Sequence, residues 1–557
     1  MQLRSGQMPE LLRHAHGSCR HSSQTSSSYI PHRPEETLLH QTLREHLETF
    51  LARARERDHP APRFVERELR GYLACGVLAH GVLRLHCDAC GCDRLVPFSC
   101  KGRGFCPSCG RRRMADTAAH LVDRVLPEVP VRQWVLSLPF ALRYRLAYDA
   151  QLTSHVLRLF IRALFASLRR RARAQWRVSR GFSGAITFVQ RFGSALNLNL
   201  HFHSLALDGV YEIRDGSAAR FHPLPPPDDG EMGRLVDRIA RHLERLLARK
   251  GFLPDADPTE ADPLAEQEPL LAALAAASVR GRVATGPRTG QRLRRLGDRV
   301  DPEASELGPG SRCASAGGLS LHANVAVPAR DRRRLERLCR YVARPPLATE
   351  RLTRHGDGRL CYRLKQRWRD GTTHVLLEPL ELLERLAPIV PPPRSHWVRY
   401  HGILAPCASW RDRVVPAGPK PIAVGSTAVS PREANDECAA GSAATGPIRI
   451  AGNAIPRNDK QVATDAGSGA PACPPRPPLP RPRRLPWAEL LQRVFDVDAF
   501  ACPRCGGRLR LLAAIESPDA IHAILDCLGL PSRAPPLAPA ERLPLEGDFE
   551  PPPAFEE

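Results

Sequence analysis

Two histidines separated by one residue, His201 and His203, have the spacing of a metal-binding pair. Apolar and polar residues alternate from Leu196 to His203, and this period of two is typical of a strand with one buried face. Residues two apart in a strand lie about 6.5 Å from each other on the same side, so both imidazoles could bind one divalent ion. An ion with open positions polarises a phosphoryl or carbonyl oxygen. A polar strand face without metal is the alternative interpretation.

Two Cys-x-x-Cys pairs, Cys87 with Cys90 and Cys106 with Cys109, are a second candidate site. Their separation is typical of a zinc ribbon, in which four thiolates surround one ion and stabilise a small fold. We therefore predict that these four cysteines hold one structural zinc ion; free buried thiols or a redox pair are the alternatives. Three further cysteines in the segment leave a second ion or an exchanged ligand open: Cys75, Cys92 and Cys100.

A third pair, Cys502 and Cys505, lies near the carboxyl end and supplies only half of a tetrahedral shell. His522 and Cys527 follow on a predicted helix and could complete the shell. Their separation of five residues fits one helical face poorly. The sequence therefore leaves open whether this pair binds a second zinc ion.

Basic residues predominate in the sequence, with 81 Lys and Arg against 59 Asp and Glu, and the net charge is +22. Nearly all of the basic residues are arginine, which suits bidentate phosphate contacts, although genome base composition also favours arginine. We expect a nucleic acid as partner. The predicted DNA contacts lie beside the cysteine pairs, where a solvated charged face is the alternative: Arg103, Arg111, Arg112 and Arg113.

Tyr341 lies in the last turn of a predicted helix that begins near Asp331 and is stopped by Pro345 and Pro346. Leu335, Leu338 and Val342 lie on the same face of this helix as Tyr341. The residues alone therefore fit a core aromatic as well as a nucleophile.

Neighbouring elements would position these residues. A strand predicted over residues 184–190 turns at Gly193 into the histidine strand, which gives an antiparallel hairpin. Another strand is predicted over residues 318–327, with His322 on its polar side. His322 is our first candidate for a third metal ligand and Gln190 the second; a hydrogen-bonded strand residue is the alternative for each.

Several segments resemble a known family. His201-Phe-His203 and its flanks, residues 198–210, resemble the HUH motif of rolling-circle nucleases. Residues 340–346 resemble the nucleophile helix of insertion-sequence-91 family transposases, and residues 105–110 resemble that family's zinc-binding domain. The resemblance extends over about residues 36–406 and 486–531. It implies an α+β fold with an antiparallel-sheet HUH endonuclease core, an amino-terminal zinc-binding domain and a small carboxy-terminal zinc-knuckle-like module.

The resemblance also implies a mechanism of rolling-circle transposition. Tyr341 Oη would attack single-stranded DNA at the ends of a mobile element, which leaves a 5′-phosphotyrosine and a free 3′-hydroxyl for later joining to target DNA. Mg²⁺ or Mn²⁺ at His201 and His203 would withdraw charge from the scissile phosphate. Some relatives carry a second tyrosine where this sequence has Pro345, so we predict the single-tyrosine type. Tyr362 and Tyr400 are expected to be structural.

Composition and resemblance together give the predicted domain organisation. Its segments are disordered residues 1–35, a zinc-binding DNA-contacting domain at 36–130, a catalytic domain at 131–406, a low-complexity linker at 407–485, a Cys-x-x-Cys module at 486–535 and an acidic tail at 536–557. No apolar run reaches the roughly 18 residues of a membrane span, and residues 1–33 lack a signal-peptide core. We therefore expect a protein of the cytoplasm, associated with the nucleoid.

Two alternatives from other classes remain open on the sequence. A non-catalytic, zinc-dependent nucleic-acid-binding protein would use the charge and the cysteines but would leave His201, His203 and Tyr341 without a role. A metal-dependent hydrolase would use water in place of Tyr341 and would form no covalent adduct.

Overall fold

Strands with alternating apolar residues form a seven-stranded antiparallel sheet in the computed structural model, which describes residues 33–214, 217–252, 262–297, 311–416 and 485–541. The strand order is β10 (Cys313–Ala316), β11 (Leu319–His322), β3 (Val131–Ser137), β6 (Leu198–Leu207), β5 (Gly184–Phe192) and β16 (Val398–Gly402). The short strand β12 (Ala326–Val327) pairs with β3 as well. The predicted hairpin is confirmed, because β5 and β6 are antiparallel neighbours.

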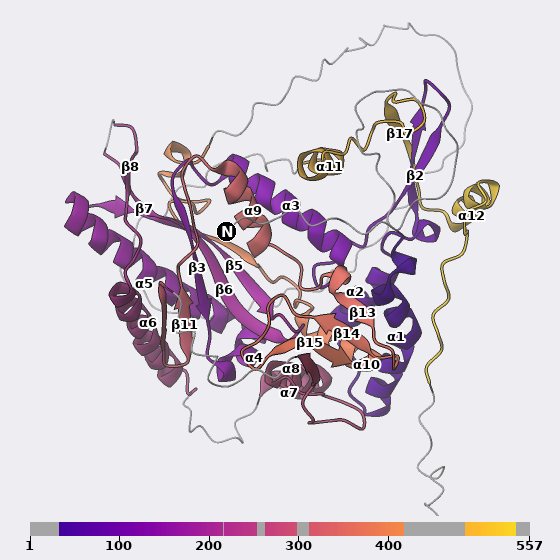
Figure 1. Ribbon diagram of the computed structural model, residues 1–557, viewed down its shortest axis with the longest axis horizontal. Coiled ribbons are helices and arrows are strands. Elements are labelled where there is room, and N and C mark those ends of the chain that lie inside the picture. Colours follow the sequence, from indigo (N-terminus) through magenta and orange to yellow (C-terminus); the bar gives the residue numbers. More distant parts are fainter. Residues whose placement is uncertain (1–32, 215–216, 253–261, 298–310, 417–484, 542–557) are drawn as a thin grey trace, which may run out of the picture. The chain divides into compact units, whose positions relative to one another are not determined.

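Helices cover both faces of this sheet (Figure 1). Phe202 of β6 belongs to a core with the helices α4 (Phe140–Tyr148), α5 (Ala150–Trp176), α6 (Asp229–Arg249) and α8 (Pro269–Arg280). Leu205 of the same strand belongs to a core with α3 (Pro107–Arg124) and α9 (Arg332–Val342). Successive strand residues face opposite sides, so His201 and His203 lie on the face that α3 and α9 cover.

A four-stranded sheet packs with the first helices of the chain. Its order is β13 (Leu352–Arg354), β14 (Leu360–Arg363), β15 (Thr372–Leu377) and β9 (Arg294–Gly297). Its buried leucines share a core with α1 (Leu38–Glu56), α2 (Arg63–Leu73) and α10 (Pro379–Leu386). A three-stranded sheet contains β4 (Gly181–Phe182), β7 (Gly209–Glu212) and β8 (Arg220–Pro223). The short helix α7 (Pro263–Gln267) precedes α8 in the sequence. Short 3-10 helices lie at Pro34–Glu36, Leu78–His80, Thr349–Arg351, Ala387–Ile389 and Arg411–Arg413.

A last small sheet joins segments from the two ends of the sequence. β1 (Val82–Cys87) pairs with β2 (Asp93–Pro97) on one side and with β17 (Leu509–Ile515) on the other. Two helices flank β17 in the sequence, α11 (Trp487–Phe495) and α12 (Pro518–Cys527). Leu490 of α11 is buried against Ala115 and Ala119 of α3. Residues 486–535, which the sequence predicted as a separate Cys-x-x-Cys module, therefore contact the amino-terminal part of the chain.

A buried ion pair fixes the ends of two central strands in the seven-stranded sheet. The Arg132 guanidinium donates to both carboxylate oxygens of Asp208 at 2.6–3.0 Å and to the Ala323 carbonyl at 2.9 Å. The two side chains are only 4% and 5% exposed. Because the guanidinium spans β3, the end of β6 and the turn after β11, it holds these three segments in register.

The predicted strand over residues 318–327 is divided, since β11 ends at His322 and β12 begins at Ala326. The predictions for residues 1–32, 417–484 and 542–557 fall outside the described residues. Within the described part of the chain, no helix combines the length and the apolar character that a membrane span requires.

Candidate metal and nucleophile site

The two histidines of β6 converge as their spacing predicted. His201 Nε2 and His203 Nε2 lie 3.0 Å apart. An octahedral ion with ligands at about 2.1 Å places neighbouring ligands about 3.0 Å apart, so both nitrogens fit one such ion. Burial lowers the pKa of His201 to about 4 and that of His203 well below its ordinary value, and nearby Arg344 lowers both further. Both imidazoles are therefore neutral near pH 7, the form in which histidine binds metals.

Gln133 of β3 forms a hydrogen bond with the His203 ring at Nδ1, the nitrogen that does not contact His201. Its amide nitrogen donates to His203 Nδ1 at 2.7 Å, while His201 Nδ1 donates to the Asn199 carbonyl at 2.9 Å. In this arrangement His203 Nε2 carries a proton and donates it to His201 Nε2. If both Nε2 atoms bind an ion, the His203 proton must move to Nδ1, and a Gln133 amide turned by 180° supplies the oxygen that accepts it.

Gln190 lies between the histidines and the end of α9. It pairs directly with His201 across β5 and β6, so the two side chains share a face of the sheet. Its amide nitrogen donates to the Val342 carbonyl at 2.7 Å. Its Oε1 is buried without a hydrogen-bond partner among the described residues. This oxygen is therefore a donor that an ion beside His201 could use.

Tyr341 extends from the last turn of α9 toward the histidines. Its ring meets the His203 ring edge-on, with centroids 6.2 Å apart. Leu338 and Val342 of α9 are buried in the core against the sheet, whereas Tyr341 is 38% exposed. The core-aromatic alternative therefore does not describe Tyr341, which a substrate can reach.

Two cations flank the tyrosine ring. Arg344 Cζ and Lys365 Nζ lie 4.4 Å and 4.1 Å from its centroid. Burial alone would raise the pKa of Tyr341, but the charge of Arg344 and the charge and hydrogen bond of Lys365 outweigh it and lower that pKa. Both cations favour the phenolate and can also bind a phosphate.

His322 lies on the histidine face of the sheet, but β3 separates it from β6. Its Nε2 contacts Ser320 Oγ at 2.9 Å and Cys313 Sγ at 3.6 Å. Among the described residues, His322 forms no group of three ligands with His201 and His203. The structure thus places Gln190, and not His322, beside the histidine pair.

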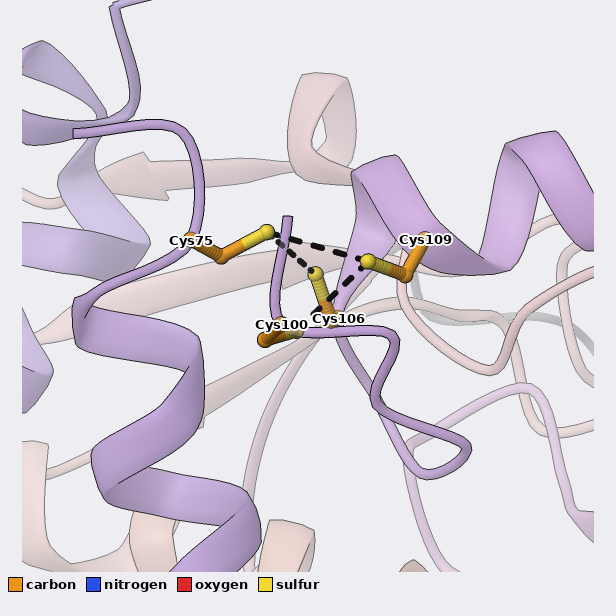
Figure 2. A group of neighbouring side chains, drawn as sticks. All are labelled: Cys75, Cys100, Cys106 and Cys109. Carbon is orange, nitrogen blue, oxygen red and sulfur yellow. Dashed lines mark hydrogen bonds between the residues drawn. The ribbon is translucent and has the colours of Figure 1, made fainter. Parts of the chain in front are cut away.

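Four thiolates form a cluster in the core of the amino-terminal segment. Figure 2 shows the sulfur atoms of Cys75, Cys100, Cys106 and Cys109 turned toward one another. Three of the separations are 3.5–3.7 Å, and sulfurs at about 2.3 Å from a zinc ion in a tetrahedron lie about 3.8 Å apart. The group therefore fits a structural zinc ion.

A second cluster contains Cys87, Cys90, Cys502 and Cys505. Cys87 Sγ lies 3.5 Å from Cys505 Sγ, and Cys90 Sγ lies 3.6 Å from Cys502 Sγ. His522 and Cys527, which the sequence offered as partners of the carboxy-terminal pair, do not belong to this group.

The structure corrects the predicted set of Cys87, Cys90, Cys106 and Cys109, because it places the two pairs in different clusters. One cause is local geometry. Cys106 lies at the N-cap position of α3, and its thiol is 3.6 Å from that of Cys75, which follows α2. Spacing in the sequence does not reveal this direction, although the three extra cysteines pointed to an exchanged ligand.

The four predicted DNA-binding arginines lie beside the first cluster. Arg111 pairs with the Glu350 carboxylate at 2.8 Å, and Arg103 donates to the Ser395 carbonyl at 3.3 Å. Arg113 donates to the Lys101 carbonyl at 3.2 Å, whereas Arg112 is exposed at the start of α3. They remain predicted DNA contacts.

Sequence reasoning missed Gln133 and Arg344 as site residues. The one available signal for Gln133 was a polar amide within an apolar strand. The signal for Arg344 was its position three residues after Tyr341. At the end of α9 the chain turns, and Arg344 folds back over the Tyr341 ring.

Comparison with protein families gives two matches. Residues 184–411 match a family model described as "Putative transposase", and residues 42–138 match one described as "Transposase zinc-binding domain", the zinc-binding domain of insertion-sequence-91 transposases. The first match contains the histidines and Tyr341, and the second contains the whole first cysteine cluster. No curated protein and no solved structure matches the chain. The order of these two domains and the cysteine cluster within the first identify the chain as a member of the insertion-sequence-91 family of transposases, which act on DNA.

Proposed function

We propose that this transposase nicks and rejoins single-stranded DNA in rolling-circle transposition, with Tyr341 as the only nucleophile of an HUH-type site. The observation that supports this most strongly is the placement of one accessible tyrosine against the ring of His203, whose Nε2 is 3.0 Å from that of His201. The alternatives of a binding protein or a water-using hydrolase give no reason for this placement.

In the proposed step, Tyr341 Oη forms a bond to the phosphorus of a DNA phosphodiester. The bond between phosphorus and the 3′-oxygen breaks, the 3′-oxygen takes up a proton, and the phenolic proton passes to solvent. The DNA 5′-end stays on the tyrosine, and attack by a 3′-hydroxyl on the phosphotyrosine later reverses the step. Lys365 and Arg344 stabilise the phenolate before attack, and their charges also attract the phosphate.

The residues of the site fit a divalent ion such as Mg²⁺ or Mn²⁺. His201 Nε2, His203 Nε2 and Gln190 Oε1 are the donors that we propose, and they would leave further positions for phosphate oxygens. An ion held there would supply charge withdrawal from the scissile phosphate. Because Gln190 also binds the Val342 carbonyl, the same side chain would link the ion to the end of the tyrosine helix.

We expect a covalent protein–DNA adduct that depends on Tyr341. Labelled single-stranded DNA from the element's ends is incubated with the full chain and Mn²⁺, and adducts are separated by denaturing gel and mapped by mass spectrometry. Tyr341→Phe should abolish the adduct because it removes the attacking oxygen and keeps the ring. His201→Ala should lower its rate at least about 100-fold, as expected when an electrostatic stabiliser is lost.

Tyr400→Phe is the matched control, since Tyr400 lies on β16 and should leave adduct formation unchanged. Metal-dependent cleavage that survives Tyr341→Phe without an adduct would favour the hydrolase. Intact DNA binding with no cleavage by the wild type would favour the binding protein.

A further inference from the structure

The second cysteine cluster is built from two matching knuckles. In each, a Cys-x-x-Cys is followed by a glycine of positive φ, Gly91 at 69° and Gly506 at 74°. In each, that glycine N–H donates to the carbonyl of the first cysteine, at 2.8 Å for Cys87 and 2.9 Å for Cys502. Two equivalent knuckles that present their thiolates to each other form a full tetrahedral shell, as in zinc ribbons. Each knuckle alone supplies half of it.

The two knuckles come from distant parts of the sequence, because Cys87 and Cys505 are 418 positions apart. The transposase zinc-binding model ends at residue 138 and so does not include the second knuckle. The strands next to the knuckles also pair: Cys87 of β1 lies opposite Leu509 of β17. The Arg510 guanidinium binds the Asp88 carboxylate at 2.7–2.9 Å.

The apolar core at this junction is very small. Its buried members are Leu85, Cys87, Cys502 and Leu509. Leu511 and Leu512 of β17 are exposed by 55% and 39%. A core of this size supplies little hydrophobic stabilisation, and in small folds a bound ion commonly takes its place.

We propose that Cys87, Cys90, Cys502 and Cys505 bind a second ion of the zinc class, separate from that of the first cluster, and that this ion fastens residues 485–541 to the β1–β2 hairpin. We call this four-cysteine site the clasp. The close approach of the knuckles supports it: a Cβ at Gly507 would lie 3.2 Å from Cys505 Sγ and 3.4 Å from Cys87 Sγ. The two knuckles are therefore closely packed at Gly507.

The segment that the clasp fastens also contacts the tyrosine helix. Arg493 of α11 donates to the Glu336 carboxylate of α9 at 2.7 Å and to Asp123 of α3 at 2.5 Å. Glu336 also accepts from Arg340, the residue before Tyr341, at 2.5 Å. The clasp would therefore keep α11 in contact with α9. The proposal does not depend on Tyr341 being the nucleophile.

The first test counts metal ions in the full chain by native mass spectrometry. The wild type should carry two zinc ions at its two cysteine clusters. Cys502→Ser with Cys505→Ser should carry one, and so should Cys87→Ser with Cys90→Ser, because either change removes half of the same shell. The ion that remains at Cys75 and its partners shows that the amino-terminal segment is still folded. Cys527→Ser, at an exposed cysteine outside both clusters, should keep both ions.

The second test measures how tightly the carboxy-terminal segment is bound to the rest of the chain. A site for a sequence-specific protease is inserted within residues 419–484 and the chain is cut after purification. The carboxy-terminal fragment should stay bound in the wild type and in Cys527→Ser. In the Cys502→Ser, Cys505→Ser variant its dissociation constant should rise at least tenfold. Two zinc ions in that variant, or equal retention of the fragment with and without the cysteines, would overturn the proposal. Neither readout uses DNA cleavage. A failure of the proposed clasp can therefore be distinguished from a failure of the proposed nuclease chemistry.

Discussion

Two glutamines lie beside the histidine pair that we propose as a metal site. Gln133 contacts His203 Nδ1, so its amide selects which nitrogen of His203 carries the proton. Gln190 binds the Val342 carbonyl and leaves Oε1 unpaired. In the proposed site, Gln133 would therefore orient a ligand, and Gln190 would join the ion to the end of α9.

We expect Gln133→Leu to weaken Mn²⁺ binding about 10-fold to 100-fold, because a leucine cannot accept the His203 Nδ1 proton and the ligand loses its orientation. The measurement is isothermal titration calorimetry with Mn²⁺ on zinc-loaded protein. Gln151→Leu is the control, since Gln151 is exposed on the first turn of α5. Equal Mn²⁺ affinities of both variants would show that Gln133 does not set the protonation of His203.

The pair itself was predictable from the sequence, and its partners were not. Alternation along residues 196–203 required His201 and His203 to share a face, and the structure confirms it. Gln133 became a neighbour only through the register of β3 against β6. That register depends on packing of the whole sheet, and a strand's own residues do not encode it. Gln190 lay opposite His201 in a predicted hairpin, which explains why it could be named in advance.

At the scale of elements, β6 carries His201 and His203 and packs into two hydrophobic cores. Its Phe202 side packs on α5 and its Leu205 side packs under α9, so neither face can shift without disturbing a core. The Arg132–Asp208 pair locks the end of this strand to β3. The position of the histidines therefore depends on a buried charge pair some distance along the same strand.

Asp208→Asn should lower the free energy of unfolding by about 3 kcal/mol, because it leaves the buried Arg132 guanidinium without its counter-charge. Urea denaturation followed by circular dichroism measures the change. Glu350→Gln serves as control, since the Arg111–Glu350 pair is exposed and should change stability by less than about 1 kcal/mol. Similar losses in both variants would contradict a special role of the buried pair.

Local elements were largely predictable, whereas pairings between distant elements were not. The amphipathic helix that precedes Pro345 and the antiparallel β5–β6 hairpin follow from periodicity and turn residues. The pairing of β1 with β17 joins residues more than four hundred positions apart, and no short-range pattern records it. The same pairing brings Cys502 and Cys505 to Cys87 and Cys90, so the missed strand pairing and the direction of the Cys106 thiol together account for the error in the predicted zinc ligands.

The whole molecule carries a net charge of +22, which favours binding to a polyanion over long distances. Arg111 and Arg112 lie on the second turn of α3, in the zinc-binding domain. If they contact two phosphates of single-stranded DNA, Arg111→Ala with Arg112→Ala should reduce the slope of log affinity against log salt by about 1.4. Fluorescence anisotropy across a series of salt concentrations measures that slope.

The matched control removes the same charge elsewhere. Arg241→Ala with Arg245→Ala changes two exposed arginines of α6, on the opposite face of the central sheet from α3. This variant should keep the wild-type slope. A slope that falls equally in both variants would mean that total charge, and not the start of α3, governs DNA binding.

The clasp has a consequence for how the protein is made. A ribosome releases the chain from its amino end, so the first cluster has all its ligands once Cys109 has emerged. The histidines and Tyr341 follow, but Cys87 and Cys90 lack their partners until Cys505 leaves the ribosome. An ion at the clasp therefore marks a chain that extends past residue 505. A product of premature termination before Cys502 would contain the whole proposed nuclease site and yet lack this ion.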